Sequence, residues 1–210
     1  MYSKPIKQLI SAFSALPSVG ERTAERFVFY LLKSGKKEAA ELILALKNLM
    51  RDVTSCPICW NFTQHRPDAD GTGAGFSDKS LCYICNDKNR DHTTICVVAE
   101  PADMEVMEKT GAFNGVYHIL RGEIRADEEL DAQNLKIKEL LARAGGPVRE
   151  IILALNPNLE GETTMMFLTK QIREKNSAIK ISRLARGLPM GSDLQYADEI
   201  TLGSALRNRT

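Results

Sequence analysis

Apolar positions recur with a helical period through the first fifty residues. In the first segment they stand three and four positions apart, at Ile6, Leu9, Ile10, Phe13 and Leu16. This spacing predicts an amphipathic helix over residues 6–16. Pro5 suits the first turn of that helix and Pro17 ends it.

Two more helices are expected before residue 51. The second runs from about Glu21 to Ser34 and is closed by Gly35, because glycine adopts the positive φ of a helix end at little cost. In the turn before it, Gly20 is expected to supply the positive φ of a tight turn. The third runs from about residue 37 to residue 50 and carries apolar side chains on one side, at Ala40, Ile43, Leu46 and Met50.

From residue 94 the pattern changes to short apolar runs separated by helical stretches. The runs ICVVA, VYHIL, EIILAL and IKISRLA are typical of buried strands. Helical patterns lie between them, at 101–110, 132–144 and 162–175, and a last strand is predicted at ADEITL, residues 197–202. Alternating strands and helices predict an α/β layer with a largely parallel sheet. The whole chain is therefore expected to be an α+β protein of several domains.

Composition and charge add a modest constraint. The chain is 43% hydrophobic and 26% charged, as in ordinary globular proteins. No apolar run approaches the roughly 18 residues of a membrane span, and no signal-peptide pattern is found, so we expect a cytoplasmic protein without membrane contact. Residues 1–50 hold eight Lys or Arg against four Glu, a local charge of +4 within a total of +1. This basic section permits nucleic-acid contact, although a solvated helix surface is the simpler interpretation.

Four of the five cysteines form two CxxC pairs, CPIC and CYIC. A CxxC turn directs two sulfurs at one ion, and two such turns complete a tetrahedral zinc site. In a reducing compartment this favours a metal over disulfides. Such a site has no open coordination position, so we expect one structural Zn²⁺ at Cys56, Cys59, Cys82 and Cys85. The alternative is a pair of redox-active dithiols or unrelated buried cysteines.

The remaining chemistry-bearing residues near the pairs carry less information. Cys96 lies inside a predicted strand and is interpreted as a buried core thiol, and His65, His92 and His118 are isolated. The insert between the pairs, residues 60–81, is rich in glycine and is expected to be an exposed flexible loop. Its GTGAG stretch does not stand between a strand and a helix, so it is not a phosphate-binding loop. The role of the insert is not given by the sequence.

The stretch LPSVGERTAER predicts a turn of small residues between two helices. Backbone N–H groups at such a turn, and at the start of the next helix, bind phosphate without reading sequence. Arg22 and Arg26 stand four apart and share a helix face. Ser18, Gly20, Arg22 and Arg26 are therefore candidate DNA-binding residues. An ordinary helical hairpin with surface arginines is an equal alternative on these residues alone.

LPSVGERTAERFVFYLL resembles the helix-hairpin-helix motif of the RecR family of bacterial recombination mediators, which reads close to LPGIGxKxAxRLAFxLL. Arg22 stands where the family has lysine, and Ser18 replaces its first glycine. The cysteine pairs followed by RDHTTICVVAEPADM, and the stretches ILALNPNLEGETT and RLARGLPMGSDLQYADEITL, are similar to later family signatures. The resemblance covers essentially the full length, although the insert between the cysteine pairs is longer than in the family.

The resemblance implies four regions. A helix-hairpin-helix DNA-binding region covers 1–53, and a four-cysteine zinc finger with its long insert covers 54–92. A Toprim domain covers 93–187, and a C-terminal segment of strand and helix covers 188–210.

The Toprim section resembles the module of topoisomerases and primases, whose carboxylates bind Mg²⁺ for phosphoryl transfer. Glu100 occupies the first acidic position, but NPNLEGE stands where a catalytic relative reads close to DPDREGE. Asn156 and Asn158 thus replace two aspartates, and the lost charge makes Mg²⁺ chemistry unfavourable. No catalytic residues are expected. In the family this surface binds partners, so Glu100, Asn156, Glu160 and Glu162 are candidate partner-binding residues; a solvated loop rim is the alternative.

The resemblance implies a non-enzymatic, DNA-binding mediator of recombinational DNA repair. Its expected partners are single- and double-stranded DNA without sequence preference, RecO and in many bacteria RecF, with RecA loaded onto single-stranded DNA as the outcome. It further implies a homo-oligomer, a tetrameric ring, located with the nucleoid. One rival is a Mg²⁺-dependent Toprim nuclease or primase-like enzyme, and another is a scaffold that binds proteins but not DNA.

Overall fold

The computed structural model describes residues 2–64, 81–125 and 134–209. Most of the insert expected to be a flexible loop, including His65, and the first residues of the helix expected at 132–144 lie outside the described residues. The chain divides into two compact units, Met1–Val53 and Thr54–Thr210, and each is considered by itself.

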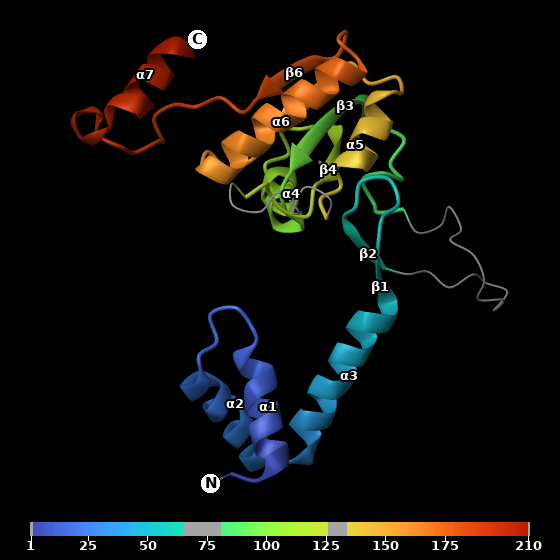
Figure 1. Ribbon diagram of the computed structural model, residues 1–210, viewed down its shortest axis with the longest axis vertical. Helices are drawn as coiled ribbons and strands as arrows, with labels where there is room; N and C mark the ends of the chain where they lie inside the picture. The colour runs from blue at the N-terminus through green and yellow to red at the C-terminus, as the bar shows by residue number, and fades with distance from the viewer. Residues whose placement is uncertain (1, 65–80, 126–133, 210) are drawn as a thin grey trace, which may run out of the picture. The chain divides into compact units, whose positions relative to one another are not determined.

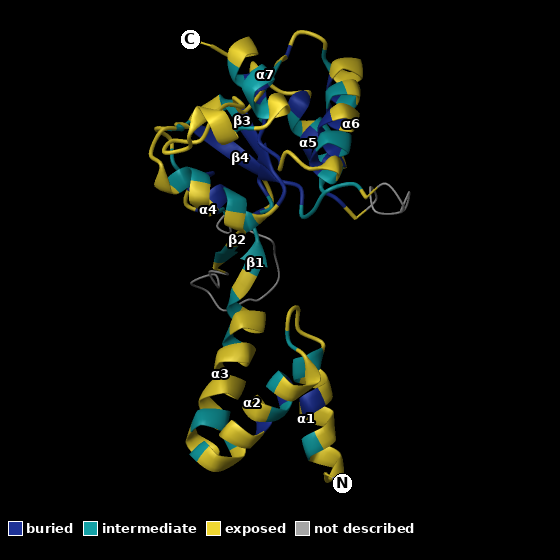
Figure 2. Cartoon of the chain, turned by 90° about the vertical axis from the view of Figure 1, so that its left-hand side faces the viewer, coloured by how far each residue is buried: buried dark blue, intermediate teal, exposed yellow. Residues whose placement is uncertain are grey.

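The first unit contains three helices, α1 (Lys4–Ser14), α2 (Glu21–Ser34) and α3 (Lys36–Asp52). The helices α1 and α2 pack against each other around a small core of Ile10, Ala24 and Val28. Little else in this unit is buried (Figure 2). Gly35 has a φ of +101°, a conformation that L side chains rarely adopt, so the expectation that it closes α2 is confirmed.

Helix α3 forms where the sequence predicts it but buries none of its side chains. The apolar residues expected on one side are exposed, with Ile43, Leu46 and Met50 all more than half accessible. Contiguous exposed apolar side chains of this kind are often found where another molecule binds.

A small two-stranded sheet of β1 (Val53–Ser55) and β2 (Phe62–Gln64) stands at the start of the second unit, although the first residue of β1 is counted with the first unit, and it frames the first cysteine pair. The main sheet and its helices follow in the order β3 (Asp91–Val98), α4 (Pro101–Lys109), β4 (Gly115–Ile119), α5 (Ile137–Ala144), β5 (Glu150–Leu153), α6 (Leu159–Lys175) and β6 (Lys180–Arg183). The unit ends with a short 3₁₀ turn (Leu194–Tyr196) and α7 (Glu199–Arg207). Figure 1 shows this order along the chain.

The four strands of the main sheet lie in the order β4-β3-β5-β6 and are all parallel. Figure 2 shows α5 and α6 together on one face of the sheet and α4 on the other. All five residues of β4 are buried, as expected for a strand covered on both faces. The predicted parallel sheet and the mixed helix and strand class are thereby confirmed.

The last strand predicted from ADEITL is wrong, because this stretch starts helix α7. Asp198 caps that helix: its side chain accepts a hydrogen bond from the backbone N–H of Thr201 at 2.9 Å. An acidic residue just before a helix is a common start signal, because its side chain accepts a hydrogen bond from the backbone N–H three positions later. The alternating pattern was too short to outweigh it.

Candidate functional site

The four cysteines of the CxxC pairs meet in one buried cluster. Their sulfur atoms all lie within 4.8 Å of one another, and Cys59 Sγ stands 3.4 Å from Cys82 Sγ. Sulfurs at the corners of a tetrahedron with metal bonds of about 2.3 Å are separated by roughly 3.8 Å, so the donor set fits a tetrahedral ion. Cys96, the fifth cysteine, is buried in β3 away from the cluster.

The electrostatics of the cluster also favour a cation. A hydrogen bond from Cys59 lowers the pKa of Cys56, while the hydrogen bond with Cys56 raises the pKa of Cys85. Four thiolates this close repel each other strongly unless a positive ion lies between them. No other group of potential ligands in the described part of the chain is close enough to hold an ion. His92 bonds to the Asp87 carbonyl instead.

The cysteine cluster is built into the core of the second unit. All four cysteines belong to the same hydrophobic cluster as β3, β4 and β5. The backbone N–H of Ile119 in β4 donates to the Cys59 carbonyl at 2.8 Å. Arg90, just after the second pair, forms an ion pair with Glu108 of α4 and donates to the carbonyl oxygens of Phe113 and Gly115.

Arg121 makes the most extensive link between the cysteine cluster and the sheet. Its Nε donates to the Trp60 carbonyl at 3.0 Å and its Nη2 to Ser55 Oγ at 3.1 Å. Its guanidinium also lies 3.8 Å from the centre of the Phe62 ring. Burial lowers the pKa of Arg121, and the nearby Glu100 opposes this. The backbone of Arg121 bonds to Ala99, so one residue joins the first cysteine turn to the carboxyl ends of the strands.

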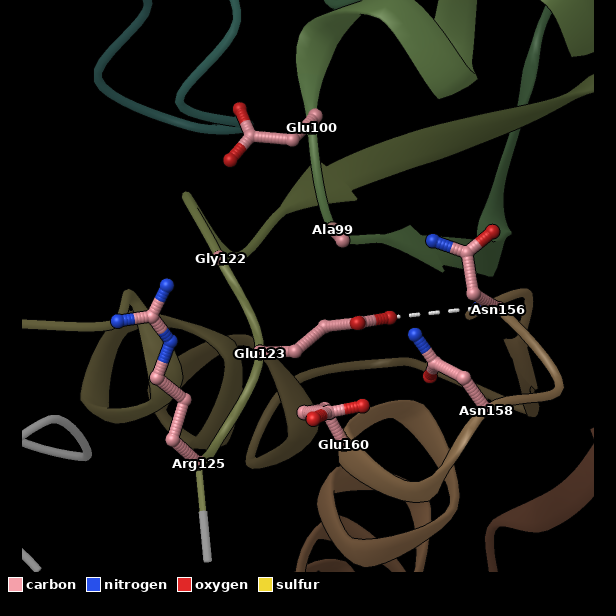
Figure 3. A pocket seen from close by; sticks show the side chains of 8 residues that line it. All are labelled: Ala99, Glu100, Gly122, Glu123, Arg125, Asn156, Asn158 and Glu160. Carbon is pink, nitrogen blue, oxygen red and sulfur yellow. Dashed lines mark hydrogen bonds between the residues drawn. The ribbon is translucent and has the colours of Figure 1, made fainter. Parts of the chain in front are cut away.

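A pocket of about 430 Å³ opens at those carboxyl ends. It lies at the end of β3, which has β4 on one side in the sheet and β5 on the other. In an open parallel sheet, ligands usually bind at such a point, where the strand order reverses. Its lining residues follow three of the four strands, β3, β4 and β5: Ala99, Glu100, Gly122, Glu123, Arg125, Asn156, Asn158 and Glu160. Figure 3 shows Glu123 and Glu160 beside the two asparagines, with Glu100 directed away from them.

One of the two asparagine side chains of the pocket is already used by the fold. The Asn158 side chain accepts a hydrogen bond from the Gly161 N–H at 2.8 Å and caps α6. The Asn156 N–H donates to Glu123 Oε1 at 3.3 Å. Glycine is required at position 161, because a Cβ there would overlap the Asn156 carbonyl oxygen. The pocket therefore presents three carboxylates. A catalytic Toprim site would have two more, from the aspartates that stand at the positions of Asn156 and Asn158.

Three of the four predicted partner-binding residues line this pocket, namely Glu100, Asn156 and Glu160. The fourth, Glu162, points elsewhere in the same helix turn and forms ion pairs with Arg183 and Arg186. Sequence reasoning missed Glu123 and Arg125. The signal that could have found them is their position directly after β4, because parallel strands end at the same edge of a sheet.

The hairpin between α1 and α2 has a different backbone from the one expected. The positive φ belongs to Ser18, at +63°, and Gly20 has an extended backbone with φ −78°. The expectation for Gly20 is therefore wrong. Ser18 stands where the related motif has glycine, and a left-handed conformation costs a non-glycine residue roughly 1 kcal/mol or more.

The hairpin leaves a group of backbone donors free. Within the described residues, the N–H groups of Ser18, Gly20, Glu21 and Arg22 have no acceptor. They stand at the positive end of the α2 dipole, where anions bind. The side chains of Arg22 and Arg26 are exposed one turn apart on α2 and form no ion pair in this part of the structure.

Comparison with protein families gives three matches along the chain. A model described as RecR, helix-hairpin-helix matches residues 6–50, and one described as Toprim domain matches residues 93–185. A third, described as RecR, C-terminal, matches residues 187–210. Among the helices that the structure describes, none is long and apolar enough to cross a membrane.

Proposed function

The chain belongs to the RecR family, and from this premise we propose that it is a DNA-binding mediator of recombinational repair that catalyses no reaction itself. The observation that carries the proposal is the hairpin before α2. There, unbonded backbone N–H groups and two exposed, unpaired arginines stand together on one helix end. Both kinds of group bind phosphate and neither reads a base.

The proposed binding is electrostatic and tolerant of sequence. Phosphate would lie against the amides of Ser18 and Gly20, and Arg22 and Arg26 would extend the contact along the sugar–phosphate backbone. Such contacts release counterions, so affinity should fall steeply with salt.

The absence of catalysis in this proposal rests on the pocket. Metal-dependent phosphoryl transfer needs a dense set of carboxylates to hold Mg²⁺, and here amides occupy two of the positions. The carboxylates of Glu100, Glu123 and Glu160 nevertheless favour one alternative, a Mg²⁺-dependent nuclease or primase-like activity. That alternative requires Mg²⁺-dependent cleavage or synthesis that Glu100→Ala abolishes.

The same pocket is the proposed docking site for protein partners. Its carboxylates would receive a basic surface of RecO, and in many bacteria RecF, so that RecA is loaded onto single-stranded DNA. Glu162 belongs to this proposal less directly, because it is held in ion pairs with two arginines. A scaffold that binds proteins without DNA is the competing view.

Two further parts of the proposal concern the metal and the assembly. The cysteine cluster would hold one structural Zn²⁺, which chemically supplies a fixed crosslink between the two cysteine turns. The exposed apolar side of α3 supports self-association, and a tetrameric ring in the cytoplasm, with the nucleoid, is the assembly that membership implies.

A pull-down with RecO, with and without single-stranded DNA, tests the proposal, with oligomeric mass measured alongside. We expect wild type to bind RecO and the double variant Glu123→Gln/Glu160→Gln to bind it several-fold less while binding DNA normally. If the double variant captures RecO as well as wild type does, the partner site lies elsewhere on the protein. Mg²⁺-dependent turnover of DNA by the purified protein would contradict the absence of catalysis.

A further inference from the structure

Helix α2 carries a stripe of residues whose chemistry goes beyond phosphate contact. The residues are Arg22, Arg26, Tyr30 and Lys33, at spacings of four, four and three. At about 100° per residue they fall within an arc of about 80°. All four side chains are exposed, and the arc lies opposite the buried residues Ala24 and Val28.

The stripe carries three positive charges, and the acids of α2 lie off it. By the same helical geometry Glu21 and Glu25 fall about 100° or more from its centre. Glu25 is engaged with Tyr2, whose pKa is raised because its hydroxyl donates a hydrogen bond to that carboxylate. The cations of the stripe are thus available to a polyanion that follows the helix.

Tyr30 differs from the other aromatic residues of this helix. Phe27 packs edge-on against Phe13 at 5.7 Å between ring centres, and Phe29 packs against Tyr2 at 5.3 Å. Tyr30 is 63% exposed, and within the described residues it has no ring contact and no hydrogen bond. Its ring is a flat apolar surface held between the positive charges of Arg26 and Lys33.

An aromatic ring among cations suits one kind of nucleic acid. In single strands the faces of the bases are free to stack on a protein ring while the phosphates contact the cations. In a duplex the faces of the bases already stack on one another, so a protein ring reaches them only if base pairs are unstacked. The positive charges of this surface favour a polyanion as its ligand. The exposed ring favours a polyanion whose bases are unpaired and free to stack.

We infer that Tyr30 is a base-stacking residue that gives this chain a preference for single-stranded over double-stranded nucleic acid. The inference rests on the proposed function, because it places the stacked base on the strand that Arg22 and Arg26 bind. It adds a specificity that neither the hairpin amides nor the arginines supply.

The test compares Tyr30→Ala and Tyr30→Phe with wild type, using a labelled oligothymidine strand and a duplex of equal length at fixed salt. Stacking contributes about 1–3 kcal/mol per base, so Tyr30→Ala should weaken single-strand binding by about five-fold to 150-fold. Duplex binding should change less than two-fold, and Tyr30→Phe should bind like wild type. Leu32→Ala, which removes an exposed apolar side chain of α2 away from the stripe, is the matched control.

The possible outcomes separate the inference from the proposed function. Equal losses on both nucleic acids, or no loss on either, would overturn the stacking role. A change in oligomeric mass for Tyr30→Ala would overturn it too, because the ring would then belong to a contact between copies of the chain. If Arg22→Ala/Arg26→Ala abolishes binding while Tyr30→Ala does not affect it, the DNA-binding function stands and the inference falls.

Discussion

Arg121→Ala should loosen the attachment of the cysteine cluster to the sheet. The substitution removes two hydrogen bonds, to the Trp60 carbonyl and to Ser55 Oγ, and the contact with the Phe62 ring. It does not change the conformational strain of the backbone, because position 121 keeps its φ of +69° with either side chain.

The magnitude follows from these contacts. A hydrogen bond from a charged donor contributes about 1.5–3 kcal/mol, and a cation over an aromatic ring contributes about 0.5–1 kcal/mol at a partly exposed site. The guanidinium is only partly buried, so we take the lower ends of these ranges. The substitution also removes the cost of burying the charge, which offsets part of the lost stability. The expected loss in the free energy of unfolding is about 2–3 kcal/mol.

Urea unfolding of the metal-loaded protein measures this loss, and the rate of metal release to a chelator gives a second readout. Arg121→Lys keeps the charge but cannot reach both acceptors, so it should lose an intermediate amount. Ser55→Ala removes one hydrogen bond alone, and in the double variant with Arg121→Ala it should add almost nothing. A loss below about 0.5 kcal/mol for Arg121→Ala would refute this role for the link.

Three other predictions concern single positions. Ser18→Gly should stabilise the protein by about 1 kcal/mol in thermal or urea unfolding, because glycine adopts the φ of +63° without strain; a loss of stability would contradict the geometry of the hairpin. Cys56→Ser should lower metal content and stability together, whereas Cys96→Ala should keep the metal, as metal analysis after gel filtration would show; equal metal loss in both would contradict the four-cysteine site. Burial and the nearby Arg143 lower the pKa of His118 to about 3, so its contribution is complete above pH 6.5 and declines as the pH falls toward 3. Between pH 6.5 and 5 the loss should be about 1.6 kcal/mol, and His118→Gln should remove that part of the pH dependence in urea titrations; an unchanged slope would show that His118 is not held neutral.

The sequence predicted the helices and parallel strands well because each has a long or strongly apolar pattern. The cysteine site also followed from the CxxC spacing, but the strand order β4-β3-β5-β6 comes from the structure alone. It failed at α7, where a short alternating stretch resembled a strand and the cap at Asp198 decided the outcome.

The details of the candidate sites depended on the tertiary structure. The positive φ of the turn was expected at Gly20, but the backbone has it at Ser18, because only the closed hairpin determines which residue turns left-handed. Glu123 was not identified, since it comes to the pocket only through the parallel arrangement of β4 and β5. Glu162 was predicted at the same surface as Glu160 from the family resemblance, but the first turn of α6 sends the two side chains to different neighbours.

The central claim is that the hairpin before α2 binds nucleic-acid phosphate electrostatically. The measurement that tests it most directly is the salt dependence of single-stranded DNA affinity for wild type and Arg22→Ala/Arg26→Ala, with folding and metal content shown to be equal. Each lost phosphate contact on a single strand should reduce the slope of log K against log salt by about 0.7, so the double variant should bind more weakly with a slope shallower by up to about 1.4. An unchanged affinity and slope at low salt would contradict the account.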